Sequence, residues 1–405
     1  MKKGIECEKA LELWLGALDF KNKVQGTEMA GLLEAEGRIL AEDLYAKVAV
    51  PSFPRSAMDG YCVRSSDLAG KGEKEPVVLQ VMGENLAGDY NEIEYKPGTA
   101  VRVMTGGYVP EGYDAVVRQE DTDYGESEVK IFCRVKPYMN YCRVGEDIEK
   151  GSLLIRKGTI LTPAHIGIGA SVGCLELCVK KKLRVVILAT GSELSRPGEA
   201  LRPGSIYNNS AYMLGSSLKR AGLELTGIEM IADDEALLTE VLYRAVKEND
   251  IVITTGAVSV GKRDIMEKCL LAAGAEVIFS RCNIQPGTPT IGSVLGGKPV
   301  LSLSGNPYAA YANFEMYFWD LAAEYAGCEG LRPKPGRAVL RSDYEKVNKH
   351  RRLIRAYEEG GFVYLNSGVN ASSVISNMTE CNCFIDLEAG RQVSIGDEVR
   401  IRRFR

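Results

Sequence analysis

The chain has 405 residues, enough for about three ordinary domains that are stable without disulfides or bound metals. Charged residues make up 26% and hydrophobic residues 45%, and 50 Lys and Arg against 54 Asp and Glu give a formal net charge of -4. This mixed surface argues against a nucleic-acid-binding protein, and no apolar run approaches the ~20 residues that a membrane span needs. The composition therefore predicts a soluble globular protein without membrane segments.

The numbers and spacing of cysteines and histidines limit the redox state and the kinds of site that the protein can have. The 11 cysteines stand singly along the chain, with no CxxC pair and no leading apolar segment for secretion. We therefore expect reduced thiols and a cytoplasmic location. His165 and His350 are the only histidines, which excludes a His-rich metal site and argues against a Ser-His-Asp hydrolase.

The predicted secondary structure changes twice along the first half of the chain. Helical spacing of apolar residues predicts helices over residues 5–18 and 28–36. Pro51 and Pro54 then interrupt regular structure, and short β-type runs follow. Next come Gly-punctuated strands and a small-residue helix after Thr162, which we expect to pack back on the opening helices. The predicted domains of this half are a discontinuous, helical N-terminal domain, 1–50 plus 139–180, and an inserted β domain, 51–138.

From residue 183 onwards, buried strands and amphipathic helices alternate. Strand-like runs at 184–190, 225–231 and 250–256 are separated by helical segments, and a long helix is predicted over residues 307–326. This alternation predicts a doubly wound, mostly parallel α/β sheet. A Pro- and Gly-rich linker and a series of short strands then predict a C-terminal β-barrel. The predicted domains of this half are a central α/β domain, 181–329, and the β-barrel, 330–405.

Three loops that follow predicted strands share small and hydroxyl-bearing residues. In a parallel sheet such loops meet at one edge, where glycines admit a phosphate to the backbone N–H groups and helix N-termini favour anions. A single loop of this kind is more often a tight turn, but three together predict a phosphate-bearing ligand. They match neither GxGxxG nor GxxxxGK[ST], so neither a nicotinamide site nor a P-loop is indicated. The candidate ligand-binding residues are Thr190, Gly191 and Ser192; Thr255, Gly256, Ser259 and Gly261; and Ser304, Gly305, Asn306 and Pro307.

Three carboxylates lie in or beside these loops. Glu193 stands in the first loop, Asp233 ends the second strand of the repeat, and Asp264 heads a helix. Converging carboxylates would repel a phosphate unless a hard cation lay between them, so Mg²⁺ is the consistent occupant. Helix capping explains Asp233 and Asp264 equally well, but it does not explain Glu193.

Other candidate residues are supported less by local chemistry. Asp59-Gly60 and the run MTGG at 104–107 are typical of turns. Arg281 precedes the rigid bend QPGTP and is a candidate oxyanion contact, and Arg355 lies in a basic cluster that would suit a phosphate. Both patterns are also typical of a solvated surface. The candidate ligand-binding residues here are Arg281, Gln285, Pro286, Gly287 and Arg355.

Seven separated segments, in this order, resemble the molybdopterin molybdenumtransferase (MoeA and gephyrin E-domain) family over essentially the whole chain. They include SAMDG at 56–60, MTGG at 104–107, GED at 145–147, TGSEL at 190–194, TGAVSVGKRD at 255–264, QPGTP at 285–289 and SGNP at 304–307. The resemblance implies the four domains given above, with a central domain like the molybdopterin-adenylylating proteins. By motif it assigns functional positions to Asp59, Thr105, Asp147, Glu193, Asp233 and Asp264.

The resemblance also implies an activity. Family members insert molybdate into adenylylated molybdopterin with Mg²⁺ and release AMP, in a homodimer whose active site joins two subunits. Glu193, Asp233 and Asp264 would hold the Mg²⁺, and Asp59 and Thr105 would come from the partner subunit. Contacts with a molybdopterin adenylyltransferase and with apo-molybdoenzymes are further implied partners.

This chain departs from the usual family motifs at four positions. Ala257 replaces a glycine, Ser304 replaces a proline, and Gln285 and Thr288 stand where lysines often occur. Lysines in the bend would help to bind an oxyanion. The alternative hypothesis is therefore a divergent pterin-binding paralogue, either a non-catalytic scaffold or carrier or an insertase that prefers tungstate.

Overall fold

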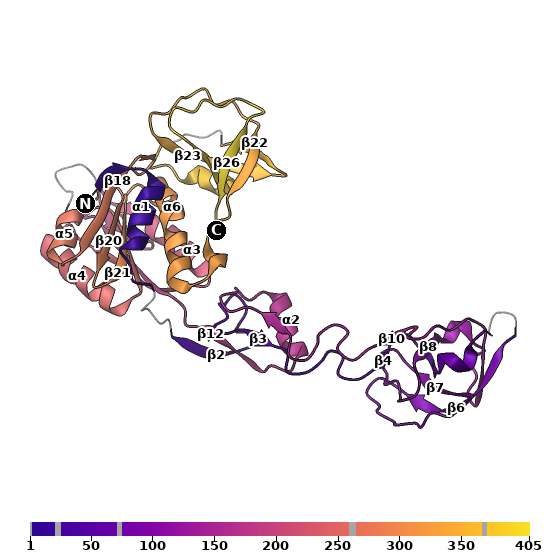
Figure 1. Cartoon of the computed structure of the whole chain (residues 1–405). Helices are drawn as coiled ribbons and strands as arrows, with labels where there is room; N and C mark the ends of the chain where they lie inside the picture. The colour runs from indigo at the N-terminus through magenta and orange to yellow at the C-terminus, as the bar shows by residue number, and fades with distance from the viewer. Residues whose placement is uncertain (1, 21–25, 71–74, 259–264, 367–370) are drawn as a thin grey trace.

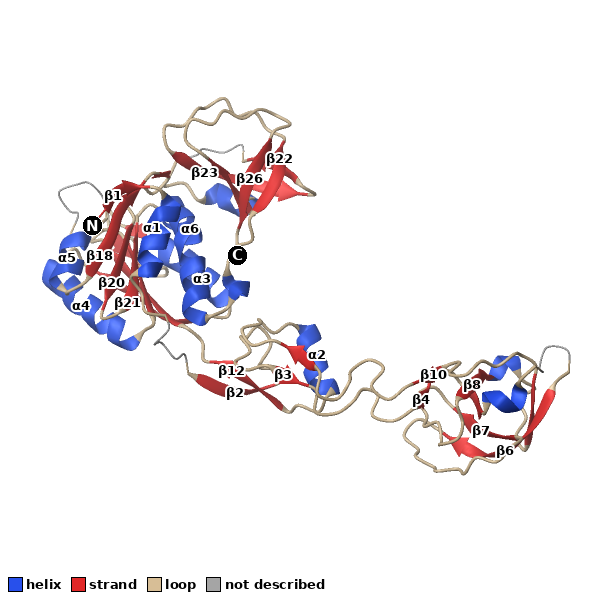
Figure 2. Ribbon diagram, viewed as in Figure 1, coloured by secondary structure: helices blue, strands red, loops and turns tan. Residues whose placement is uncertain are grey.

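The molecule is elongated and carries most of its mass at one end (Figure 1). The computed structural model describes residues 2–20, 26–70, 75–258, 265–366 and 371–405. An α/β body carries a β-barrel on one side, and a small domain and a β domain extend away from the body in line (Figure 2). Within the described ranges no helix is long and apolar enough to cross a membrane. All eleven cysteines are free thiols.

A seven-stranded sheet forms the centre of the α/β body. Only β20 runs antiparallel to its neighbours, so the predicted doubly wound, mostly parallel sheet is confirmed. Strands β13 and β17 are buried along almost their whole length and rich in Val and Ile, as expected for a sheet that is covered on both faces. The strand order is β1 (Lys2–Ile5), β18 (Glu276–Cys282), β20 (Ile291–Leu295), β21 (Lys298–Leu303), β17 (Ile251–Thr255), β13 (Arg184–Thr190) and β16 (Glu224–Ile231).

Helices cover both faces of this sheet. Alternate residues of each strand point to opposite faces, and each face has its own apolar cluster. Helix α6 is buried nearly all round because it lies between the sheet and the C-terminal barrel. The helices are α1 (Cys7–Gly16), α3 (Ser210–Arg220) and α6 (Pro307–Ala326) on one face, and α4 (Glu235–Glu248) and α5 (Met266–Ala272) on the other.

The opening helix forms, but it does not pack where we expected it. Strand β1 pairs in parallel with β18, and α1 packs on the central sheet rather than against residues 139–180. Trp14 of α1 is fully buried, lies edge-to-face against Phe279, and donates its indole N–H to the Ser293 carbonyl at 2.9 Å. The large apolar ring and its polar N–H thus both have partners on this sheet, which explains the placement.

The predicted helix over residues 28–36 is wrong. Strand β2 (Thr27–Gly31) pairs over its whole length with β12 (Glu176–Lys180). Helix propensity is a weak preference, and the pairing satisfies the backbone of both segments. Around this ribbon, α2 (Pro163–Ser171), β3 (Leu44–Tyr45) and β11 (Leu153–Ile155) complete a small domain with its own apolar core.

The distal β domain is joined to the small domain by two chain segments (Figure 2). Strand β4 (Arg55–Ser56) pairs with β10 (Tyr141–Cys142) where these segments enter the domain. The main sheet has the order β8 (Ala115–Arg118), β5 (Gly60–Val63), β7 (Thr99–Val103), β6 (Val77–Asn85) and β9 (Glu128–Ile131).

The C-terminal strands form the predicted barrel. It closes because β23 pairs with both β24 and β25. Strand β19 (Ile284–Gln285) leaves the α/β body and pairs with β23, which brings the QPGTP bend between the two domains. The barrel strands are β22 (Gly336–Leu340), β23 (Arg351–Glu359), β24 (Phe362–Leu365), β25 (Cys383–Leu387) and β26 (Glu398–Arg403).

Candidate active site

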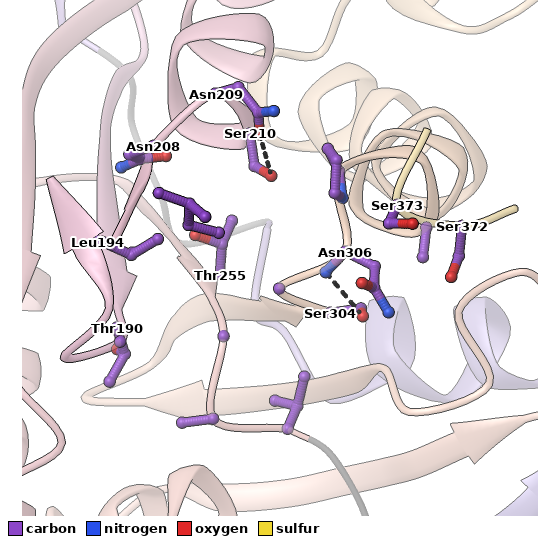
Figure 3. Close-up of a pocket in the computed structure, with 18 of the residues that line it drawn as sticks. Thr190, Leu194, Asn208, Asn209, Ser210, Thr255, Ser304, Asn306, Ser372 and Ser373 are labelled. Carbon is purple, nitrogen blue, oxygen red and sulfur yellow. Dashed lines mark hydrogen bonds between the residues drawn. The ribbon is translucent and has the colours of Figure 1, made fainter. Parts of the chain in front are cut away.

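A cavity of about 1120 Å³ opens at the carboxyl ends of the parallel strands, where the candidate loops meet (Figure 3). It extends from the loop after β13 to the first turn of α6 and the edge of the barrel. The structure thus brings together residues that the sequence placed in separate motifs. The predicted residues that line it are Thr190, Gly191, Glu193, Asp233, Thr255, Gly256, Pro286, Gly287, Ser304, Gly305, Asn306 and Pro307.

Glycines allow the three loops to pack backbone against backbone. Gly256 has φ +90°, and a Cβ there would lie 2.1 Å from the Thr190 carbonyl oxygen. A Cβ on Gly305 would in turn lie 3.5 Å from the Cα of Gly256. Any larger residue at position 256 would separate the first two loops, so this glycine is required by the shape of the cavity.

Two of the three predicted metal ligands face the same cavity. Glu193 and Asp233 line it, and the N–H and Oγ of Ser192 donate to Asp233 Oδ2 at 3.3 and 3.2 Å. Asp264, Ser259 and Gly261 lie outside the described residues. Among the residues described, no three His, Cys, Asp or Glu side chains form a metal-binding cluster. The two carboxylates are nevertheless the hard oxygen donors that Mg²⁺ prefers.

Two helices begin at the cavity and direct their positive ends into it. Asn208 Oδ1 accepts the Ala211 N–H at 3.2 Å at the start of α3. At the start of α6, the Asn306 N–H donates to Ser304 Oγ at 3.2 Å (Figure 3). Such helix N-termini favour a bound anion.

Several lining residues were not predicted. Strands β14 (Leu194–Ser195) and β15 (Ile206–Tyr207) form a short ribbon beside the first loop, and Ser372 and Ser373 reach the cavity from the barrel domain. The segment SIYNNS at 205–210 follows the TGSEL motif closely in the chain, and its two asparagines just before α3 were the available signal. The serine pair follows no motif, and only the packing of the barrel on α6 brings it to the cavity. The additional lining residues are Leu194, Ile206, Tyr207, Asn208, Asn209, Ser210, Ala257, Val258, Pro289, Ala309, Ser372 and Ser373.

The QPGTP bend presents its backbone and prolines to the cavity. Pro286, Gly287 and Pro289 line it, but Gln285 does not, since its Oε1 accepts from Arg352 at 3.4 Å. Arg281 is exposed and is not part of the lining.

Arg355 lies behind the cavity rather than in it. Its side chain is fully buried, with the guanidinium carbon 4.1 Å from the centre of the Tyr308 ring. It donates to Asn377 Oδ1 at 2.6 Å and to the Val374 carbonyl. The Tyr308 N–H in turn donates to the Ser372 carbonyl at 3.1 Å. Arg355 holds the Tyr308 ring and the Val374 carbonyl, and so it helps to fix the segment that carries Ser372 and Ser373.

Asp59, just before β5, and Thr105, just after β7, contact each other in the β domain, which lies at the far end of the molecule from the α/β body (Figure 1). The backbone N–H and hydroxyl of Thr105 both donate to Asp59 Oδ1 at 2.7 Å. These two hydrogen bonds, the backbone one first, hold the pKa of Asp59 below its usual value. Asp147 is exposed on the connection between the small domain and the β domain, and its N–H donates to the Val50 carbonyl at 3.0 Å.

Fold and site together define a multidomain α/β protein with a cavity suited to a phosphate-bearing ligand. Three family models match the chain in order: the MoeA N-terminal region (domain I and II) over residues 5–173, a probable molybdopterin binding domain over 186–323, and the MoeA C-terminal region (domain IV) over 337–404.

Known relatives and solved structures agree with these models. The chain is 34% identical to a molybdopterin molybdenumtransferase of Haemophilus influenzae, over 93% of this chain and 94% of the relative. It is 35% identical to one of Bacillus subtilis, over 90% of this chain and 86% of the relative. A crystal structure of a molybdopterin biosynthesis MoeA protein from Pyrococcus horikoshii superimposes with a TM-score of 0.86 at 29% identity, covering 99% of this chain and 100% of that chain. The chain therefore belongs to the molybdopterin molybdenumtransferase (MoeA) family, as its motifs predicted.

Proposed function

We propose that this protein, a transferase of molybdenum cofactor biosynthesis, inserts molybdate into adenylylated molybdopterin, with Mg²⁺ as cofactor and AMP as product. The observation that carries this proposal is the single cavity in which Glu193, Asp233 and two helix N-termini meet. Such a site suits a substrate with two linked phosphoryl groups, and relatives that match at least 90% of the chain are named molybdopterin molybdenumtransferase. A cytoplasmic location and contacts with a molybdopterin adenylyltransferase and apo-molybdoenzymes belong to the same proposal.

In the proposed reaction the two thiol groups of molybdopterin bind molybdenum, and one oxygen of molybdate leaves with their two protons as water. A water molecule attacks one phosphorus of the phosphoanhydride, the bond between the two phosphoryl groups breaks, and AMP leaves, with no change of oxidation state. Glu193, Asp233 and, by motif, Asp264 would hold Mg²⁺, which when bound supplies positive charge beside the phosphoryl oxygens. Ser192 keeps Asp233 oriented through its two hydrogen bonds. Backbone N–H groups at the starts of α3 and α6 stabilise the negative charge of the substrate.

A second copy of the chain completes this site in our proposal. Within one chain the Asp59–Thr105 pair lies in the β domain, at the far end of the molecule from the cavity (Figure 1). The Asp59–Thr105 pair and the carboxylates of the cavity can contact the same substrate only if they come from different chains. A two-fold homodimer would supply both of its sites in this way.

Time courses of AMP release and molybdenum incorporation, measured together with the purified protein, test the activity. We expect Glu193→Gln and Asp233→Asn each to lower the rate by about a hundredfold or more, since each removes a ligand charge beside the phosphates. Removal of Mg²⁺ has the same expected result. Glu240→Gln, which alters an exposed acid on α4, serves as the control. Full activity of the Glu193→Gln, Asp233→Asn double variant would overturn the proposal.

Mixing two inactive variants tests the shared site. Asp59→Asn and Glu193→Gln homodimers are each expected to be inactive, but a mixed dimer places both substitutions in one site and leaves the other site intact. Random exchange of subunits should therefore restore about a quarter of the activity of the natural protein. A mixture that remains inactive after exchange, which labelled subunits would verify, contradicts the shared site.

One observation favours the alternative of a non-catalytic paralogue. The described residues that line the cavity include neither Lys nor Arg. A paralogue that only carries the pterin would bind molybdopterin tightly and release no AMP with either molybdate or tungstate. AMP release with tungstate alone would instead indicate an insertase that prefers tungstate.

A further inference from the structure

A buried amide on α6 holds the QPGTP bend in place. Asn313 is fully buried, and its Nδ2 lies 3.1 Å from the Pro286 carbonyl oxygen and 3.2 Å from that of Gly287. The same nitrogen donates to the Ala309 carbonyl of its own helix at 3.0 Å. One amide group thus joins two consecutive carbonyls of the bend to the second turn of α6.

The bend fits around this amide without spare room. Gly287 has φ +92°, and a Cβ there would lie 1.7 Å from Asn313 Nδ2. The threonines of the bend bond inward, Thr288 Oγ1 to the Ile284 carbonyl and Thr290 Oγ1 to the Gly287 carbonyl, both at 2.8 Å. The amide of Asn313 is therefore the contact that ties the middle of the bend to the helix.

Both structures that the amide joins are walls of the cavity. Pro286 and Gly287 line one side, and Pro307 and Ala309 of α6 line the adjoining side. A change in the distance between the bend and α6 alters the width of the cavity at this corner. The two hydrogens of the amide are shared among three carbonyls, and an apolar or carboxylate side chain would leave the Pro286 carbonyl without this donor or repel it.

We propose that Asn313 is a positioning residue for substrate binding: its amide sets the position of the QPGTP bend relative to α6. This inference rests on the proposed function, because the cavity that it shapes is the proposed substrate site. In this chain Gln285 and Thr288 place no charge in the bend, so the bend contributes its shape and backbone, and Asn313 determines that shape.

A comparison of two buried asparagines tests the role. Asn249 is also buried and also donates its Nδ2 to the carbonyl four residues earlier, Ala245, at 2.9 Å, but it lies at the end of α4 and lines no part of the cavity. Asn313→Ala should raise the KM for molybdate or for adenylylated molybdopterin about tenfold and change kcat less than twofold, because it displaces a wall and leaves the carboxylates in place. Asn249→Ala should leave both constants unchanged.

The variant Asn313→Ser distinguishes the contact of the amide with its own helix from its contacts with the bend. A serine hydroxyl bonds the Ala309 carbonyl within the helix but does not reach the bend, so this variant should show the raised KM with little loss of stability. It also keeps the test decisive if Asn313→Ala folds poorly, which melting curves would reveal. A KM for Asn313→Ser equal to that of the natural protein would overturn the inference.

Failure of the proposed function is distinguishable from failure of this inference. If the natural protein binds molybdopterin but inserts no metal, the proposed function fails, and the same variants are compared by their Kd for molybdopterin in titration calorimetry. A Kd raised about tenfold for Asn313→Ser but not for Asn249→Ala would still support the positioning role. Equal Kd values would overturn it.

Discussion

Ala257 adopts a backbone conformation that favours glycine. It lines the cavity with φ +56°, at the motif position where the family usually has glycine. The left-handed region is unfavourable for a residue with a Cβ, so Ala257→Gly should raise the free energy of unfolding by about 1 kcal/mol. Urea unfolding measures the change. Ala273→Gly, at φ -72°, is the control and should lower stability, and a loss of stability in both variants would contradict the prediction.

Glu315 is a buried acid on α6 that should make stability depend on pH. Its burial raises its pKa to about 7, against the opposing effects of Trp319 and Arg402. Between about pH 4.5 and 7 the unfolded chain loses this proton while the folded chain keeps it. The contribution of this group to stability is therefore complete below about pH 4.5 and is lost as the pH rises through 7.

Comparison with the Glu315→Gln variant measures the contribution of Glu315 to the pH dependence of stability. Between pH 4.5 and 7.5 the natural protein should lose about 3 kcal/mol more stability than Glu315→Gln, because the amide does not titrate. Denaturant unfolding across this range gives the measurement. Parallel pH profiles for the two proteins would show that Glu315 titrates near its ordinary value.

The loop after β7 should control the ionisation of Asp59. Thr105→Val removes the hydroxyl donor but keeps the backbone N–H, so the pKa of Asp59 should rise toward its usual value. If Asp59 serves the reaction, kcat/KM should fall about tenfold. NMR titration of the Asp59 carboxylate and insertion kinetics give the two readouts. Thr105→Ser keeps the hydroxyl and should match the natural protein, so a Thr105→Ser variant as impaired as Thr105→Val would contradict the explanation.

At the level of elements, the local sequence pattern predicted a helix or strand correctly where a single hydrophobic periodicity dominates the segment. Helix α6 begins at Pro307 and ends at Ala326 as predicted, because a proline stands at its first position and the apolar run is long. Strand β20 was not predicted, and residues 28–36 were assigned to the wrong structure. In short segments the partner strand decides the conformation, and a partner such as β12 lies more than a hundred residues away.

A buried ion pair lies within the C-terminal barrel, and its arginine also reaches the first helix. Arg351 donates to both oxygens of Asp386 at 2.6 Å and also contacts Glu8 of α1. Arg351→Met should cost about 3 kcal/mol, because it leaves the buried carboxylate of Asp386 unpaired. Chemical denaturation measures the loss.

The matched control is an exposed ion pair on the same barrel. Arg337 pairs with Glu398 at 2.7 Å with both side chains largely exposed, and Arg337→Met should cost less than about 1 kcal/mol. Replacing both Arg351 and Asp386 by apolar residues should recover much of the loss. Equal losses for Arg351→Met and Arg337→Met would show that the buried Arg351–Asp386 pair contributes little.

By itself the sequence determined the family, the alternating α/β core, the barrel and twelve of the residues that line the cavity. Those features depend on local motifs and on periodicities that one segment carries. The tertiary structure alone decided that α1 packs on the central sheet, that Ser372 and Ser373 reach the cavity, and that Arg355 and Asn313 support its walls from behind. These placements arise from packing between segments distant in the chain, where burial and the satisfaction of polar groups select the partner and no local pattern records the choice.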